Sequence, residues 1–285
     1  MFEVDSTLFK KKILETFKYT KKLLERHNLK YIACGGTVLG AIRHQGFIPW
    51  DDDIDIYMPR EDYNKLIQLN IESEKEGFQI ISAEYTPGYY LPFAKIVDAN
   101  SSIWEHKEIP FMIGVYVDIF PLDEFPYSNI EITNIQNRAT KLFNSYMFTL
   151  SHYNLNYLID SIINLDLKRF GGWCKSTFLK STMQYKKYFS YIKKYTDLHG
   201  DKCVCINTWQ GKVFKTEWFT NVIEVPFEDT TIIIPRDYDS YLTLLYGNYM
   251  TPPPIEKRIS GHNHYFIDLT RRYTLEEIRK KGINC

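Results

Sequence analysis

The segment 34–56 constrains the fold of this chain more than any other; it reads CGGTVLGAIRHQGFIPWDDDIDI. Aspartate and isoleucine alternate at its end. Because successive side chains of a strand point to opposite faces, Asp53 and Asp55 share one face, and Ile54 and Ile56 share the other. The pattern predicts a strand that buries its isoleucines and presents a pair of carboxylates.

Two carboxylates on one strand face repel each other unless a positive charge lies between them. Mg²⁺ takes oxygen ligands, usually one or two carboxylates plus substrate phosphates. Asp118 occurs in the same setting, between two apolar residues. We therefore predict a Mg²⁺ (or Mn²⁺) site held by Asp53, Asp55 and Asp118. A solvated acidic loop is the alternative, and Asp51, which shares the parity of Asp53, is an alternative ligand. Asp52 would point to the opposite face of the strand from Asp53, which indicates a structural role.

A glycine pair precedes this strand. Gly35 and Gly36 follow an expected short strand at 31–34 and open an expected helix from Thr37 to Arg43, capped near Thr37. Without Cβ atoms, the backbone N–H groups of such a turn can approach a phosphate, and the helix dipole favours the anion. The turn is thus a candidate phosphate site to which Arg43 adds positive charge. An ordinary turn remains the alternative.

The rest of the chain predicts an α/β (α+β) protein. Residues 6–27 have the spacing of an amphipathic helix, and 128–200 is rich in Tyr, Lys, Asn and Leu at helical spacing. We expect a catalytic core at 1–127, a helical insertion at 128–200, and strands and a tail at 201–285 that complete the core. A further helix is expected at 237–246. The expected strands are 53–58, 79–82, 93–97, 114–120, 202–206, 222–225 and 231–234.

Composition excludes some classes of function and indicates a cellular location. The 285 residues carry 35 basic and 35 acidic side chains, which argues against a protein that grips nucleic acid through phosphates. The acidic N-terminus does not resemble a signal peptide, and the longest apolar run, 111–122, is too short to cross a bilayer. Five scattered cysteines are typical of free thiols in a reducing compartment. The expected location is the cytoplasm.

The fuller string GGTVLGAIRHQGFIPWDDDIDIYMPREDY resembles the LicD family of phosphotransferases, to which the fukutin group is related. The likeness extends to FAKIVD at 93–98, VDIFPLD at 117–123, PRDYD at 235–239 and the block at 246–250. The family's usual YGDYM reads YGNYM here, with Asn248 in place of a carboxylate. Essential catalysis is therefore not expected at that position.

The resemblance implies a nucleotidyltransferase-like mixed β-sheet core with flanking helices. It also implies transfer of phosphocholine from CDP-choline, or of a similar phospho-alcohol from another CDP-alcohol, onto a sugar hydroxyl. The acceptor would be a cell-surface glycan, such as a lipopolysaccharide or teichoic acid, or its lipid-linked precursor. By position, Asp53, Asp55 and Asp118 correspond to the family's metal ligands, and Gly35 to Thr37 to its nucleotide-phosphate turn. The alternatives are a nucleotidyltransferase acting on a small sugar or alcohol phosphate, and a non-catalytic glycan-binding protein.

Four further cationic residues are candidates for the donor site. Lys95, inside an apolar strand, is expected to point toward the phosphates, with an edge-strand lysine as the equal alternative. Arg258, His262 and His264 form a basic tail after a proline run and are expected to contact the donor phosphate or the acceptor. Ordinary surface histidines are the alternative there.

A choline group would need an aromatic cage, because it offers no hydrogen-bond donor. The candidates by position are Trp50, Trp104, Tyr116 and Trp209, although core or rim packing is the better explanation for any one of them. Aromatic and basic residues alternate at 185–188 and 191–195, which suits peripheral contact with a membrane as well as a solvated helix face.

Overall fold

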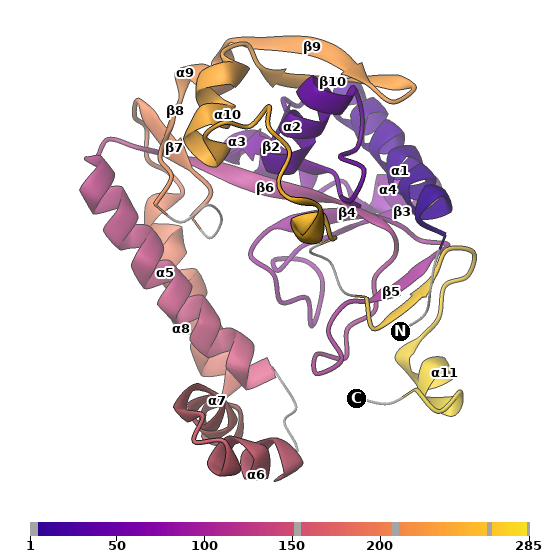
Figure 1. Ribbon diagram of the computed structural model, residues 1–285, viewed down its shortest axis with the longest axis vertical. Helices are drawn as coiled ribbons and strands as arrows, with labels where there is room; N and C mark the ends of the chain where they lie inside the picture. The colour runs from indigo at the N-terminus through magenta and orange to yellow at the C-terminus, as the bar shows by residue number, and fades with distance from the viewer. Residues whose placement is uncertain (1–4, 151–154, 207–210, 261–263, 284–285) are drawn as a thin grey trace.

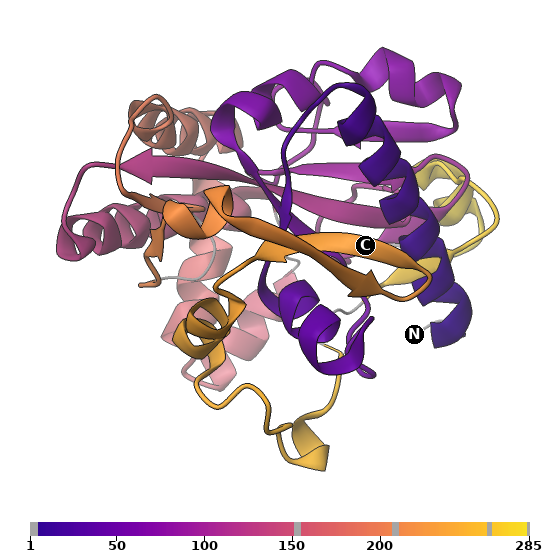
Figure 2. The same cartoon turned by 90° about the horizontal axis from the view of Figure 1, so that it is seen from above.

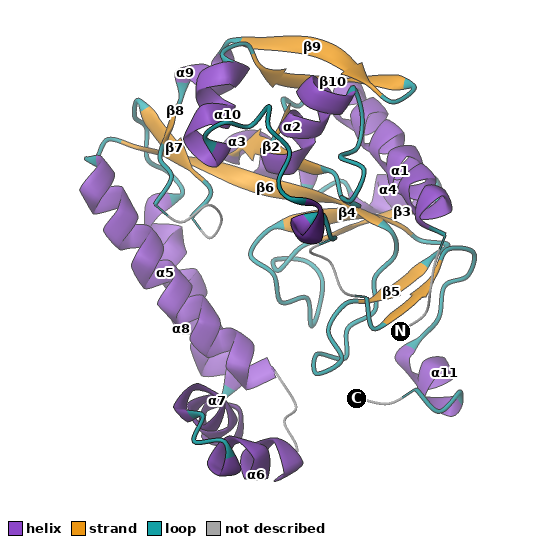
Figure 3. Cartoon of the chain, viewed as in Figure 1, coloured by secondary structure: helices purple, strands orange, loops and turns teal. Residues whose placement is uncertain are grey.

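The computed structural model describes residues 5–150, 155–206, 211–260 and 264–283. A mixed seven-stranded sheet forms its centre (Figures 1 and 3). The order β1-β2-β6-β4-β3 is antiparallel except for the parallel pair β2 and β6, and β7 and β8 extend from the far end of β6. The strands are β1 Ile32–Ala33, β2 Asp55–Pro59, β3 Phe78–Ile81, β4 Ala94–Asp98, β6 Tyr116–Phe125, β7 Lys202–Val204 and β8 Phe214–Lys215.

Helix α1 (Ser6–Arg26) packs on β4 and β6 with an apolar stripe that includes Phe9, Ile13 and Phe17. The helix begins where the Asp5 carboxylate accepts hydrogen bonds from two backbone N–H groups of the first turn. Figure 2 shows α1 and the hairpin of β9 and β10 on the same side of the sheet. The other elements of the core are α2 Gly35–His44, α3 Arg60–Leu66, α4 Asn70–Lys75, α9 Glu217–Thr220, β9 Val222–Phe227, β10 Thr230–Pro235, α10 Tyr238–Tyr246 and η2 Ile255–Lys257.

Two smaller parts complete the molecule. Strands β5 (Ser102–Trp104) and β11 (Phe266–Asp268) pair antiparallel, and α11 (Leu275–Lys280) follows them. A helical arm projects from the end of β6 and consists of α5 Asn129–Leu150, α6 Leu155–Ile163, α7 Leu167–Phe178, α8 Ser181–Ile192 and η1 Lys193–Tyr195. Helices α5 and α8 run side by side, and α6 and α7 lie at the far end of the arm (Figure 1).

The structure confirms the mixed α/β class and most of the expected elements, within one to a few residues at their ends. It corrects the start of α2, which begins at Gly35 rather than near Thr37 and has no side-chain cap. Strand β2 begins at Asp55, so Asp53 precedes it, and β6 runs on to Phe125. The pair of β5 and β11 was not expected. Across the described ranges, no helix combines the length and apolarity that a membrane span requires.

Candidate active site

Asp55 and Asp118 lie opposite each other on the parallel strands β2 and β6. The backbone fixes this register, since the Asp118 N–H donates to the Ile54 carbonyl at 3.1 Å. Ile54 and Ile56 are fully buried beneath, as the alternation predicts. Because residues paired across neighbouring strands point to the same face, the two carboxylates project together from the sheet.

The backbone of Asp55 is hydrogen-bonded to residues of the glycine turn. Its N–H donates to the Thr37 hydroxyl at 2.9 Å, and its carbonyl accepts from the Cys34 N–H at 3.1 Å. The buried Oδ1 of Asp55 has no hydrogen-bond partner among the described residues. Burial, followed by the charges of Asp53 and Asp118, raises the pKa of Asp55 well above its usual range. A bound cation would give the buried Asp55 Oδ1 a partner. It would also offset the repulsion between Asp55 and the carboxylates of Asp53 and Asp118.

Lys95 of β4 lies on the other side of Asp118. Its side chain is 2% exposed, and Nζ lies 2.8 Å from Asp118 Oδ1 and 3.4 Å from Glu105 Oε1. Burial opposes the ammonium charge, but the carboxylates of Asp118 and Glu105 more than offset it, and the pKa of Lys95 is raised. Strand β4 lies between β6 and β3, so the edge-strand alternative for Lys95 is wrong.

Glu105 was missed by the sequence analysis. It follows β5 in an irregular segment, where no periodicity marks a residue as functional. Its carboxylate accepts from the Tyr116 hydroxyl at 2.7 Å, and the Lys95 Nζ lies 3.3 Å from the centroid of the Tyr116 ring. Although burial opposes it, the charge of Lys95 and the Tyr116 hydrogen bond lower the pKa of Glu105. Lys95 is thus enclosed by two acids and an aromatic face.

Within the described ranges, no three His, Cys, Asp or Glu side chains are already gathered into a metal-ligand cluster. A magnesium ion usually needs only one or two carboxylates when substrate phosphates supply the other ligands. Asp55 and Asp118 provide such a pair. The full ligand set of Asp53, Asp55 and Asp118 stays a prediction.

Both glycines of the turn occupy positions that a larger residue would not fit. Gly35 has a φ of +52°, a left-handed conformation that glycine adopts without strain, and its N–H donates to the Tyr241 hydroxyl at 2.9 Å. A Cβ on Gly36 would lie 2.8 Å from Asp51 Oδ2. The Thr37 N–H donates to the Cys34 carbonyl. Two of the three N–H groups expected to bind phosphate therefore have partners within the chain, and the Asp51 carboxylate lies close to Gly36.

A pocket of about 340 Å³ opens beside Gly36. Arg43 and Arg258, far apart in the sequence, both approach the Trp50 ring, with 5.8 and 5.3 Å from each Cζ to the ring centroid. Burial and the charge of Arg258 lower the pKa of Arg43. Two guanidinium groups on one ring form a site suited to an anion. The lining is Gly36, Leu39, Arg43, Ile48, Trp50, Asp51, Tyr246, Asn248, Tyr249, Thr251 and Pro253.

The sequence analysis did not assign the tyrosines of this pocket, although Tyr246 and Tyr249 belong to the 246–250 block. Asn248, the departure from the family block, lines the same pocket. Of the tail histidines, His262 lies outside the described residues. His264 packs edge-on against Phe9, with ring centroids 5.4 Å apart.

The candidates for an aromatic cage differ in whether the structure leaves them able to contact a ligand. Trp104 is fully buried in a cluster with Phe266 and Tyr273 and cannot contact a ligand, so its candidacy is wrong. The Tyr116 ring faces Lys95. Trp209 lies outside the described residues. Trp50 lines the pocket and is the candidate that the described structure supports.

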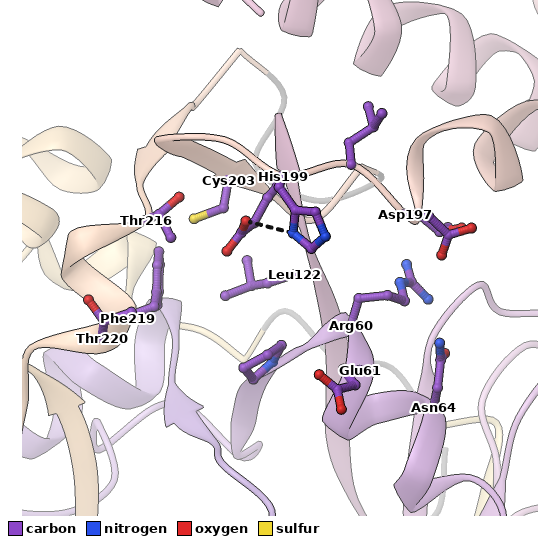
Figure 4. A pocket seen from close by; sticks show the side chains of 14 residues that line it. Arg60, Glu61, Asn64, Leu122, Asp197, His199, Cys203, Thr216, Phe219 and Thr220 are labelled. Carbon is purple, nitrogen blue, oxygen red and sulfur yellow. Dashed lines mark ion pairs between the residues drawn. The ribbon is translucent and has the colours of Figure 1, made fainter. Parts of the chain in front are cut away.

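A second cavity of about 380 Å³ lies at the other end of β6, between α3, β7 and η1 (Figure 4). At its edge Arg60 makes a bidentate ion pair with Asp123, at 2.7 Å for both bonds. His199 forms an ion pair with Glu124 at 3.5 Å. Glu124 lies six positions after Asp118 along the strand, roughly 20 Å away. This cavity is therefore distinct from the aspartate site.

Residues 28–158 match the family described as LicD/FKTN/FKRP, nucleotidyltransferase domain. The chain is 31% identical over 255 residues to the lipopolysaccharide cholinephosphotransferase LicD of Haemophilus influenzae, a match that covers 87% of this chain and 92% of the relative. It is 43% identical over 131 residues to the uncharacterized protein RP689 of Rickettsia prowazekii, across 42% of this chain and 48% of that one. It is also 42% identical over 55 residues to the human ribitol 5-phosphate transferase FKRP, across 19% and 11% of the two chains.

The aspartate strand, the glycine turn and the third aspartate all fall within the matched domain. The longer alignment with LicD extends the likeness over most of the chain. The chain therefore belongs to the LicD family.

Proposed function

We propose that this protein is a phosphotransferase of LicD type that moves phosphocholine, or a similar phospho-alcohol, from a CDP-activated donor to a sugar hydroxyl of a glycan. The acceptor is a cell-surface glycan or its lipid-linked precursor, met at the cytoplasmic side of a membrane. A relative named for cholinephosphotransfer and another named for ribitol 5-phosphate transfer support the reaction class. The observation that carries the proposal is the register of Asp55 opposite Asp118, with a buried Asp55 Oδ1 that bonds to none of the described residues.

A Mg²⁺ or Mn²⁺ ion held by Asp53, Asp55 and Asp118 would neutralise the charge of the donor diphosphate. Residues of the chain bind the donor and accept the proton. Arg43 and Arg258 bind the diphosphate beside Trp50, in the pocket that Gly36 also lines.

Asp118 accepts the proton of the acceptor hydroxyl, either directly or by aligning that hydroxyl. The hydroxyl oxygen forms a bond to the phosphorus of the transferred group. The phosphorus–oxygen bond to CMP breaks, and CMP departs with the electron pair. Lys95, paired to Asp118, fixes the direction of the carboxylate. Positioning and charge neutralisation are the main demands of such a transfer.

The test is incubation of the protein with a panel of CDP-alcohols and a glycan acceptor, with Mg²⁺ or with a chelator. CMP is then measured by chromatography. We expect CMP release that depends on donor, acceptor and Mg²⁺ together. Release of pyrophosphate from a nucleoside triphosphate would instead favour a nucleotidyltransferase. Glycan binding without any turnover would favour a non-catalytic glycan-binding protein.

A further inference from the structure

The far end of the helical arm carries an exposed apolar surface that the catalytic proposal does not use. We define the arm tip as the described residues of α6 and α7 with the turn between them, 155–178. Its exposed large apolar side chains are Leu155, Ile159, Ile162, Ile163, Leu165, Leu167, Phe170 and Phe178. We propose that the arm tip inserts into the surface of an anionic lipid bilayer.

The burial pattern of α6 is the reverse of that in an ordinary surface helix. The apolar stripe of such a helix normally faces the core and its polar side faces water. In α6 the polar Ser161 is 1% exposed, whereas Ile163 is 72% exposed. The isoleucine side of the helix therefore faces away from the protein.

The turn between α6 and α7 shows the same preference. Leu165 is 85% exposed and has a φ of +51°, and Leu167 is 82% exposed. A left-handed residue in a surface turn is most often Gly or Asn, because a larger side chain is strained there. Leucine at this position packs little against the described residues, so a contact outside the chain is the simplest reason for it.

The tip helices are nevertheless held in place. A Cβ on Gly172 would lie 2.8 Å from the Phe148 ring of α5, and Arg169 lies over the Tyr157 ring at 4.4 Å from its centroid. The Asp166 carboxylate caps α7 by accepting from two backbone N–H groups. The apolar side chains thus project from a defined surface whose inner side is already packed.

The charged residues at and after the arm tip favour an anionic lipid surface as its partner. Within the arm tip, 155–178, the sequence has three basic residues, Lys168, Arg169 and Lys175, against two acidic ones, Asp160 and Asp166. Three more lysines follow the tip without any acidic residue between them: Lys180 directly before α8, and Lys186 and Lys187 on α8. Apolar side chains bordered by cations match the boundary between acyl chains and anionic headgroups. A projecting tip also suits insertion into a bilayer better than a broad, flat protein interface (Figure 3).

The experiment is co-sedimentation of the full chain with phosphatidylcholine vesicles that contain or lack phosphatidylglycerol. It needs neither donor nor acceptor, so its outcome is independent of the proposed function. We expect binding to the anionic vesicles that weakens as salt is raised. The double substitution Ile163→Ser and Leu167→Ser should reduce the partition coefficient about a hundredfold, roughly tenfold for each apolar side chain removed.

Ile71→Ser with Ile130→Ser is the matched control, because both isoleucines are exposed but lie on α4 and at the base of α5. This variant should bind as the wild type does. The single change Leu165→Asn should weaken binding without lowering the melting temperature, since asparagine tolerates the left-handed turn. Absence of vesicle binding, or equal binding by the tip variant, would overturn the proposal. So would self-association of the wild type that the tip variant abolishes, because a second copy would then cover the tip.

Discussion

Lys95 Nζ lies 2.8 Å from Asp118 Oδ1, and the two residues face each other on the antiparallel strands β4 and β6. The ammonium group also approaches Glu105, so one buried cation serves two carboxylates. Removing one member of a buried ion pair leaves an uncompensated charge and costs far more than losing a surface pair. The arrangement therefore couples the stability of the core to the charge of Asp118.

Replacing Lys95 by methionine should lower the free energy of unfolding by about 3–5 kcal/mol, because Asp118 and Glu105 remain buried without their cation. Urea-induced unfolding followed by circular dichroism measures the change. Adding Glu105→Gln to Lys95→Met should recover part of the loss, since one of the two carboxylates is then neutral. An unchanged urea midpoint for Lys95→Met would contradict the role assigned to this ion pair.

Asp55→Asn and Asp118→Asn should each reduce CMP release by about a thousandfold, because each removes charge where the diphosphate is neutralised. Asp55→Asn should also raise the melting temperature in the presence of a chelator. The raised pKa shows that the folded protein favours the neutral form of this side chain, which asparagine imitates. Asp52→Asn is the neighbouring control and should keep its activity within a few-fold. If Asp52→Asn lost activity as fully as Asp55→Asn, the role assigned to Asp55 would not be specific to its place on β2.

Arg258→Met should raise the KM for the CDP-alcohol about tenfold with little change in kcat, since a guanidinium beside Trp50 binds the donor phosphates before the transfer. Steady-state kinetics over a range of donor concentrations separates the two constants. Arg236→Met is the control, because Arg236 is exposed and bonds to Asn221 of the strand hairpin region. Equal KM values for Arg258→Met and the wild type would exclude this arginine from donor binding.

Gly40→Ala should destabilise the fold by about 1–3 kcal/mol or more, because its Cβ would lie 2.4 Å from the backbone oxygen of Gly46, which cannot move aside as a side chain can. Gly171→Ala is the matched control: a Cβ there meets nothing within 4 Å. Alanine in that exposed helix should stabilise the protein by about 0.5–1 kcal/mol. Thermal unfolding of the two variants gives the comparison, and a Gly40→Ala protein that melts with the wild type would show that helix α2 can shift.

Local patterns in the sequence determined much of this protein. Period-two alternation predicted the strand that carries Asp55, and helical spacing predicted α1, because both depend on which side chains must leave water. The lone acid between two apolar residues likewise predicted that Asp118 would lie on a strand, and its pairing opposite Asp55 keeps the metal site a prediction of the same pattern. Such features depend on neighbours in the chain, so they can be read without coordinates.

Only the tertiary structure decided which distant residues meet. Glu105 joins Lys95 from an irregular segment, Arg258 reaches the Trp50 ring from beyond the proline run, and Trp104 turns into the core. The start of α2 at Gly35 also depends on a distant group, since the hydroxyl that accepts the Gly35 N–H belongs to Tyr241. These contacts join residues far apart in the chain, and packing and charge compensation, which carry no local period, select them.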